Sequence, residues 1–345
     1  MATFTLPPVA DLHDAALAGR LQHAIDNKTK PLGALGRLEA LALRIGAIVG
    51  SETPVLRQPQ MLVCAADHGL AARGVSAYPS DVTWQMVENF LAGGAAVSVL
   101  ARQHGLALTV VDCGVRRDFA PRDGLIVRKV AQGTADASTG PAMSAAQCAE
   151  AIANGMAIVH ELPGNALLLG EMGIGNSSVA AMLLARLVGH DIEACTGAGT
   201  GLDAEGRARK ARVLRDVLAL HAGATSPLDA LAAFGGFEVA TLVGAVLQAA
   251  EERRVIVVDG FIASAAVLVA QALRPRVVQR CVAAHVSAEP GHALLLAHLG
   301  LDPLLHLDLR LGEGSGAALA WPLLESACVI LRDMASFEAA GVSRQ

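Results

Sequence analysis

Short apolar runs alternate with longer amphipathic stretches along most of the chain. The runs are continuously hydrophobic rather than alternating, which is typical of strands buried on both faces of a parallel sheet. They lie at 61–67 (MLVCAAD), 108–114 (LTVVDCG), 166–171 (ALLLGE), 255–260 (VIVVDG) and 281–285 (CVAAH). Helical spacing of apolar positions predicts helices at 82–103, 144–160, 176–189, 205–222, 236–252, 288–299 and 316–335. This strand–helix alternation predicts an α/β fold with a doubly wound, mainly parallel sheet.

The two ends of the chain predict helices without strands. Residues 11–50 carry apolar positions at helical spacing before the polar break SETP, and 316–335 is the last predicted helix. No repeat, low-complexity tract or long linker marks a domain boundary. We therefore expect one globular unit over 1–345, in which 55–315 form the α/β core. Residues 1–50 together with 316–345 are expected to form a small helical subdomain.

Composition narrows the class of partner. The 345 residues are 53% hydrophobic and 17% charged, with a formal net charge of −5 and 3% aromatic residues. Nucleic acids and anionic membranes attract clustered Lys and Arg, so neither partner is expected, and a small molecule is favoured. The six cysteines show no CxxC spacing and are interpreted as reduced core residues. No leader pattern opens the chain, and the longest apolar run, Phe261 to Leu273, is too short to span a bilayer, so a cytoplasmic enzyme is expected.

Polar and glycine-rich segments follow several predicted strands. Ligands of open α/β sheets bind beyond the carboxyl ends of the strands, so these segments are expected to converge. Gly173 to Ser178 and Thr196 to Gly201 are candidate phosphate loops, because glycine lets the backbone approach an anion and Asn or Ser can begin a helix. Taken alone, each loop is better explained as a tight turn that caps a helix. Neither segment matches GxxxxGK[ST] or GxGxxG, which disfavours a nucleoside triphosphatase or a dinucleotide-dependent dehydrogenase.

Glu171 and Glu313 are candidate catalytic carboxylates, since each follows a glycine in a ligand-like loop. A Glu near a helix start more often only complements the helix dipole. Lys210 follows the second glycine-rich loop and could reach a phosphate, although most helix lysines are solvated. His68, His285 and His292 show no metal-ligand spacing and are interpreted as structural, and no serine lies in a GxSxG elbow. No metal and no cofactor is expected.

Several longer motifs occur together and in one order along the chain. They are TKPLGALGRLE (29–39), AADHGLAARGVSAYPSDVTWQMVENFLAGGAAVSVLAR (65–102), GEMGIGNSS (170–178), TGAGTGLDAEGRARK (196–210), GGFEVATLVGA (235–245), VVDGFIASAAVLVA (257–270), AHVSAEPGHALLL (284–296) and RLGEGSGAALA (310–320). This set resembles the nicotinate-nucleotide–dimethylbenzimidazole phosphoribosyltransferase family over nearly the whole chain. The resemblance implies a Rossmann-like α/β domain with a small helical subdomain, assembled as a homodimer.

The resemblance also implies a reaction and a set of site residues. The family transfers phosphoribose from nicotinate mononucleotide to 5,6-dimethylbenzimidazole, which gives α-ribazole 5′-phosphate, for the lower ligand of cobalamin, and nicotinate. Glu313 matches the general base and Glu171 the second active-site carboxylate, while Ser80, Gln85 and Met86 lie in the stretch that resembles the base-binding wall. The nucleotide is expected to be held by Gly175, Asn176, Ser177, Ser178, Gly199, Thr200, Gly201 and Lys210.

Two positions depart from the family pattern, and the acceptor remains open. The family commonly has Arg where Ala198 stands and Thr-Thr where Ser177-Ser178 stand. Loss of the Arg removes a charge near the phosphate or ribose, whereas Ser keeps the hydroxyl of Thr. Transfer to another acceptor, such as adenine or a phenol, is an alternative, and so is a non-catalytic nucleotide-binding protein. The retained Glu171 and Glu313 argue against the second alternative.

Overall fold

A single parallel sheet of six strands forms the centre of the computed structural model, which describes residues 4–343. Its strands are β1 (Gln60–Ala66), β2 (Ala107–Gly114), β3 (Leu125–Val127), β4 (Ala166–Met172), β5 (Val255–Val258) and β6 (Cys281–Ala283). They lie in the order β3-β2-β1-β4-β5-β6, and every neighbouring pair is parallel. The predicted fold class is confirmed. The order reverses between β1 and β4, which is the point where such sheets bind ligands.

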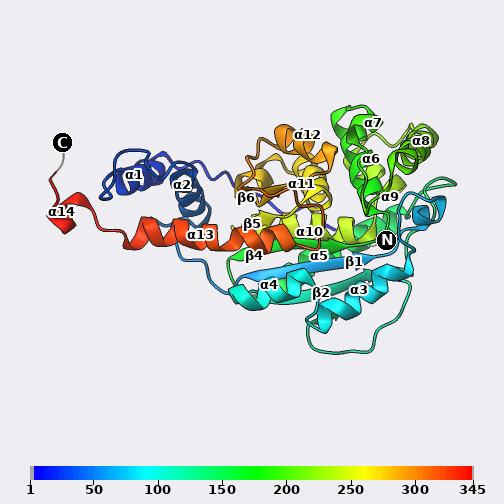
Figure 1. Ribbon diagram of the computed structural model, residues 1–345, viewed down its shortest axis with the longest axis horizontal. Helices are drawn as coiled ribbons and strands as arrows, with labels where there is room; N and C mark the ends of the chain where they lie inside the picture. The colour runs from blue at the N-terminus through cyan, green and yellow to red at the C-terminus, as the bar shows by residue number, and fades with distance from the viewer. Residues whose placement is uncertain (1–3, 344–345) are drawn as a thin grey trace.

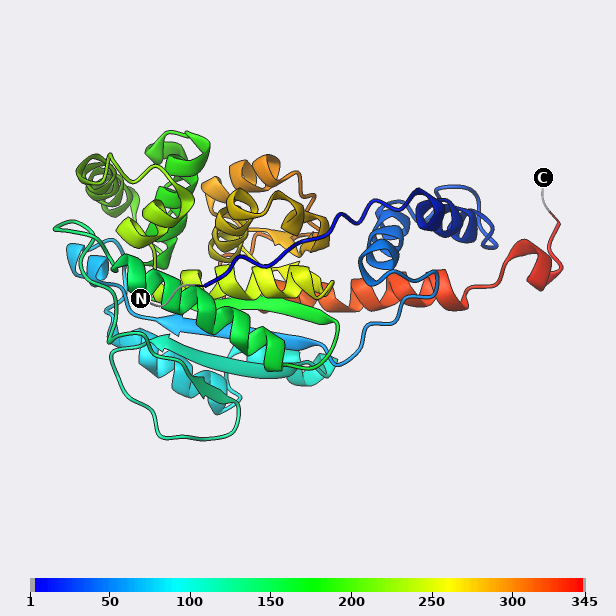
Figure 2. The same cartoon turned by 180° about the vertical axis from the view of Figure 1, so that it is seen from behind.

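Helices cover both faces of this sheet. They are α1 (Ala15–Asp26), α2 (Arg37–Val49), α3 (Asp81–Leu91), α4 (Ala96–His104), α5 (Ala145–Glu161), α6 (Asn176–Val188), α7 (Ile192–Cys195), α8 (Ala204–Leu220), α9 (Pro227–Phe234), α10 (Phe237–Glu251), α11 (Phe261–Leu273), α12 (Pro290–Leu299), α13 (Ser315–Asp333) and α14 (Phe337–Ala340). Figure 1 shows α3, α4 and α13 on one side of the strands, and Figure 2 shows α5 on the other side.

Strand β1 shows why the sheet is buried on both sides. Met61 and Val63 belong to a hydrophobic cluster with side chains of α2, α4 and α13. Leu62 and Cys64 point the opposite way and belong to a cluster with side chains of α5, α10 and α11. Because side chains alternate along a strand, a continuously apolar run supplies both cores at once.

The predicted pattern of helices and strands differs from the structure in three respects. The stretch 82–103 is two helices rather than one, because the chain turns at Gly93, whose φ is +80°, between α3 and α4. The run Phe261 to Leu273, noted above only for its length, forms the almost wholly buried helix α11. The short elements α7, α9 and β3 were not predicted, and neither was the two-stranded pairing of β7 (His285–Val286) with β8 (Leu305–His306).

The two ends of the chain pack together. Helix α2 contacts α13, and both contribute to the cluster that covers one face of the sheet. The Nζ of Lys28 donates a hydrogen bond to the carbonyl of Met334 at 2.6 Å, so the segment after α1 is tied to the end of α13. Figure 1 shows α13 running along the sheet and beyond it, with α1 and α2 to one side of the strands. Their separation as a subdomain stays a prediction. No helix in the described part of the chain is long and apolar enough to cross a membrane.

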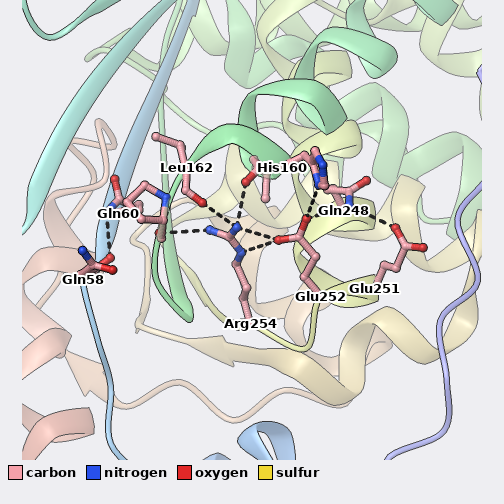
Figure 3. A network of polar contacts seen from close by, with 10 residues as sticks. Gln58, Gln60, His160, Leu162, Gln248, Glu251, Glu252 and Arg254 are labelled. Carbon is pink, nitrogen blue, oxygen red and sulfur yellow. Dashed lines mark hydrogen bonds and ion pairs between the residues drawn. The ribbon is translucent and has the colours of Figure 1, made fainter.

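A buried arginine joins α5 to the amino end of β5 (Figure 3). Arg254 is 5% exposed and donates hydrogen bonds to the carbonyls of Val159 at 2.9 Å and Leu162 at 2.7 Å, at the end of α5. Its guanidinium also pairs with Glu252, which in turn bonds His160 at 3.1 Å. The network supplies side-chain donors to carbonyls at the end of the helix, where backbone partners run out. The network therefore fixes the amino end of β5 against the end of α5.

Candidate active site

A hollow lies beyond the carboxyl ends of β4 and β5, close to the switch point of the sheet. It has about 650 Å³ of empty volume, including space open to solvent. Residues of five segments line it, namely 171–177, 199–200, 260–262, 285–289 and 310–313. Because parallel strands end at one edge, segments far apart in the sequence meet here.

Glu313 lies in a tight loop immediately before α13. Gly312, Glu313 and Gly314 have φ angles of +75°, +67° and +88°, in the left-handed region that an ordinary side chain rarely adopts. The carboxylate of Asp259, which follows β5, accepts hydrogen bonds from the backbone N–H groups of Gly314 at 3.2 Å and Ala317 at 2.9 Å. These bonds hold Glu313 in a strained conformation, and such strain concentrates at functional sites.

Glycine at position 170 lets β4 pass close to the Glu313 loop. A Cβ added to Gly170 would lie 2.6 Å from the carbonyl oxygen of Glu313. The next residue, Glu171, reaches under the same loop, since a Cβ at Gly312 would lie 2.5 Å from its Oε1. The close approach brings the two carboxylates to one wall of the hollow.

Both carboxyl groups hold their protons more tightly than usual. Burial raises the pKa of Glu171 to about 8, and the nearby negative charge of Asp259 adds to the effect. Burial and Asp259 likewise raise the pKa of Glu313 to about 7. The Nδ2 of Asn176 donates a hydrogen bond to Glu171 at 2.5 Å, which partly offsets the repulsion. Near neutral pH, Glu313 can therefore accept or release a proton, as a general base must.

Next to Glu171, the site combines a helix N-terminus with a buried amine. Helix α6 begins at Asn176 after Gly175, whose φ is +102°. The Nζ of Lys210 donates a hydrogen bond to the Oγ of Ser177 at 2.8 Å, and Lys210 is only 1% exposed. Burial lowers the pKa of Lys210 to about 8, while the negative charge of Glu289 raises it. A helix N-terminus with an adjacent cation is a favourable place for a phosphate.

The loop at 196–201 is anchored beside this wall. The backbone N–H of Gly199 donates to Glu289 at 2.8 Å, and the hydroxyl of Thr200 accepts a hydrogen bond from the N–H of Ala77 at 3.1 Å. A Cβ at Gly197 would collide with a Glu289 carboxylate oxygen, so glycine is required there for packing. The neighbouring Ala198 does not line the hollow.

The structure brings together most of the residues that the sequence analysis selected. Glu171, Glu313, Asn176, Ser177, Gly199 and Thr200 line the hollow. Gly175, Gly201 and Lys210 lie directly beside lining residues, and Lys210 contacts one of them. Ser178 is fully buried and does not line the hollow.

The residues selected for the base-binding wall lie apart from this hollow. Ser80 lines a second hollow with Asp67, Trp84 and two arginines, while Gln85 is exposed and Met86 is half-buried on α3. Helix α3 nevertheless borders the main site, because the Oγ1 of Thr83 accepts the N–H of Ile174 at 3.1 Å. The role of Ser80, Gln85 and Met86 stays a prediction.

Several lining residues were missed or interpreted differently from the sequence. His285, interpreted above as structural, contributes its ring to the hollow, and its Nε2 lies 3.6 Å from Asp259. His292, in contrast, accepts the N–H of Ser287 at 2.8 Å, and burial lowers its pKa to about 3, so it stays neutral. Phe261, Ile262, Ser287, Glu289 and Arg310 also line the hollow and were not selected. The DG and EP dipeptides in the resembling motifs were the available indications of Asp259 and Glu289.

Known proteins similar to this chain span nearly its whole length. The family model DBI_PRT, described as phosphoribosyltransferase, matches residues 10–342. A nicotinate-nucleotide–dimethylbenzimidazole phosphoribosyltransferase of Variovorax paradoxus strain S110 is 82% identical over 99% of this chain and 98% of its own length. The protein of the same name from Cupriavidus necator is 57% identical over 98% of both chains. The crystal structure of CobT from Thermus thermophilus matches with a TM-score of 0.93 and 43% identity, over 96% of this chain and 100% of that one. The chain belongs to the DBI_PRT family of phosphoribosyltransferases.

Proposed function

We propose that the protein transfers phosphoribose from nicotinate mononucleotide to 5,6-dimethylbenzimidazole, which gives α-ribazole 5′-phosphate and nicotinate. The name shared by the two relatives supplies the substrate pair. The observation that carries the proposal is the strained, buried Glu313, whose pKa is raised to about 7. It lines the same hollow as the first turn of α6, where Lys210 contacts Ser177.

The reaction requires one proton to leave the acceptor. A ring nitrogen of the benzimidazole attacks C1′ of the ribose and forms the new C–N bond, while the other ring nitrogen releases its proton to Glu313. The old C–N bond breaks at the same carbon, and nicotinate departs with the bonding electrons, which neutralises its pyridinium nitrogen. The leaving group therefore needs no acid. General-base assistance of this kind is worth about 10²- to 10⁴-fold.

The nucleotide side of the site has a different task. We propose that the phosphate binds at the first turn of α6, where Ser177 and Lys210 are joined by a hydrogen bond. The phosphate stays on the ribose, so it is held rather than transferred, and this chemistry does not call for a metal ion. Fixing both substrates in line supplies a large share of the barrier reduction.

Glu171 has a separate part in the proposal. Its pKa of about 8 keeps most of it protonated at neutral pH, so it is not the resting base. As substrates bind and positive charge develops on the ribose, ionisation of Glu171 becomes more favourable, which stabilises the transition state. Asn176 keeps the carboxyl oriented toward the hollow throughout.

Incubation of the purified protein with nicotinate mononucleotide and a panel of bases tests the proposal. Dimethylbenzimidazole should yield equal amounts of nicotinate and a product with the mass of α-ribazole 5′-phosphate, and the rate should be unchanged in chelator. If a product formed only with adenine or a phenol, that compound and not dimethylbenzimidazole would be the acceptor. Nucleotide binding without any product would identify a non-catalytic binding protein instead.

We also propose that the protein works as a homodimer. Leu307 and Leu311, in the loop that leads to Glu313, are 54% and 57% exposed, and a second subunit would remove this apolar surface from water at the mouth of the hollow. Sedimentation at micromolar concentration should give twice the chain mass. A monomer would contradict this part of the proposal. The location in the cell stays a prediction.

A further inference from the structure

The charged groups that line the hollow are unevenly distributed. Three carboxyl groups, those of Glu171, Glu289 and Glu313, line it. Among the described lining residues, Arg310 is the only Lys or Arg. Its side chain is exposed and makes no hydrogen bond or ion pair with any described residue. No described residue therefore pairs with this guanidinium and explains its place in the lining.

Arg310 is nevertheless held in a defined place. The carbonyl of Leu309 accepts the N–H of Ala288 at 2.9 Å, which continues the short pairing of β7 with β8. Arg310 follows this anchor directly and precedes Glu313 by three residues in one loop. The backbone that carries the guanidinium is therefore fixed on both sides, by Ala288 before it and by the Asp259 bond to Gly314 after it.

The charges of the two proposed substrates indicate which group a guanidinium in this place would bind. In the proposed reaction the acceptor is a neutral heterocycle, and the phosphate of the donor already has Lys210 and the α6 N-terminus. The remaining negative charge is the carboxylate of the nicotinate ring. Guanidinium recognises carboxylate through two parallel hydrogen bonds, and a neutral carboxamide presents only one acceptor and a repelled donor.

We propose that Arg310 binds the carboxylate of the pyridine ring and thereby makes the enzyme select nicotinate mononucleotide over nicotinamide mononucleotide. This inference rests on the proposed function and extends it to the choice of donor. Arg310 is a specificity residue rather than a catalytic one, because it touches neither the bond that breaks nor the proton that moves. The positive charge of Arg310 also offsets the negative charge of the lining carboxylates, which would otherwise repel a negatively charged nucleotide.

Comparing the two nucleotides in matched variants tests the inference. Arg310→Gln should lower kcat/KM for nicotinate mononucleotide about tenfold, as expected for loss of one solvent-accessible charge-assisted pair. It should leave kcat/KM for nicotinamide mononucleotide nearly unchanged, so that the preference collapses. Arg310→Lys keeps the positive charge but cannot form the two parallel hydrogen bonds, and it should give an intermediate preference. Arg276→Gln removes an exposed guanidinium outside the hollow and serves as the control.

Each outcome has one meaning. Equal losses for both nucleotides, or no loss for either, would overturn the role of Arg310 while the proposed function stands. If the wild-type enzyme turned over neither nucleotide, the proposed function would fail. Calorimetric titration of the same variants with both nucleotides would then still decide the inference, because selection by Arg310 acts on binding.

Discussion

Replacing Glu171 with Gln should make the protein more stable at alkaline pH. In the folded chain Glu171 is buried, with 5% of its surface exposed, near Asp259 and Glu313, and its pKa is raised from 4.5 to about 8. Above pH 8 the wild-type protein must therefore hold a buried negative charge close to two other carboxylates. Gln has the same shape and still accepts the hydrogen bond from Asn176, but it carries no charge.

The magnitude follows from the two pKa values. Below about pH 4.5 the carboxyl is protonated in both states, so wild type and variant should be equally stable. As pH rises from 4.5 to 8, the unfolded wild-type chain ionises first, and its folded state loses stability by up to about 1.36 kcal/mol per pKa unit. Values of 4.5 and about 8 set an upper limit of roughly 5 kcal/mol. Because the neighbouring carboxyls share the repulsion, we expect a gain of about 2 to 4 kcal/mol at pH 8.5.

Urea unfolding of both proteins between pH 4.5 and 9 measures this difference. The exposed Glu150→Gln on α5 is the control for an ordinary Glu-to-Gln change and should show no trend with pH. A stability gain that is the same at every pH, or a loss at pH 8.5, would refute the reasoning. The first result would mean that ionisation of Glu171 is not linked to folding, and the second that the fold stabilises its anion.

Three further variants address the base, the phosphate site and the scaffold. Glu313→Gln should lower kcat by about 10²-fold while nicotinate mononucleotide still binds, and wild-type kcat/KM should rise with pH through about 7 as Glu313 ionises; a near-normal kcat would remove Glu313 as the base. Lys210→Met should weaken nicotinate mononucleotide binding about tenfold in calorimetry, and unchanged affinity would exclude it from the phosphate site. Arg254→Met removes the buried side-chain donor to the carbonyls of Val159 and Leu162 and should lower the free energy of unfolding by about 2 to 4 kcal/mol, with kcat/KM retained; a loss of activity in the folded variant would contradict its purely structural role.

The sequence predicted the sheet well because its strands are buried on both faces. A run such as 166–171 is short and continuously apolar, whereas a surface helix is longer and alternates between apolar and polar positions with a helical period. The same argument failed for Phe261 to Leu273, because a helix buried all round loses the amphipathic period that identifies helices. The break between α3 and α4 depends on backbone conformation at Gly93, and a single glycine within a helical pattern is compatible with a continuous helix.

At the site, the sequence analysis found the two carboxylates but missed residues that hold or surround them. Glu313 stands in a glycine-rich loop and Glu171 near the end of β4, just before another, and both were found because glycine lets a chain approach a ligand closely. Asp259 was identified only as a strand end, because its role lies in two hydrogen bonds to the backbone around Glu313, and such long-range contacts leave no local pattern. Arg310 was likewise missed, since its meaning comes from the carboxylates that surround it in space.

The anomeric configuration of the product tests the central claim most directly. The account holds that one ring nitrogen of the base displaces nicotinate in line at C1′ while the other ring nitrogen gives its proton to Glu313. This displacement turns the β-linked donor into an α-linked product. Proton NMR of the product from nicotinate mononucleotide and dimethylbenzimidazole should show the α anomer alone. A β-linked product would mean that the displacement occurs with retention, through a covalent or dissociated ribosyl intermediate, and would contradict the account.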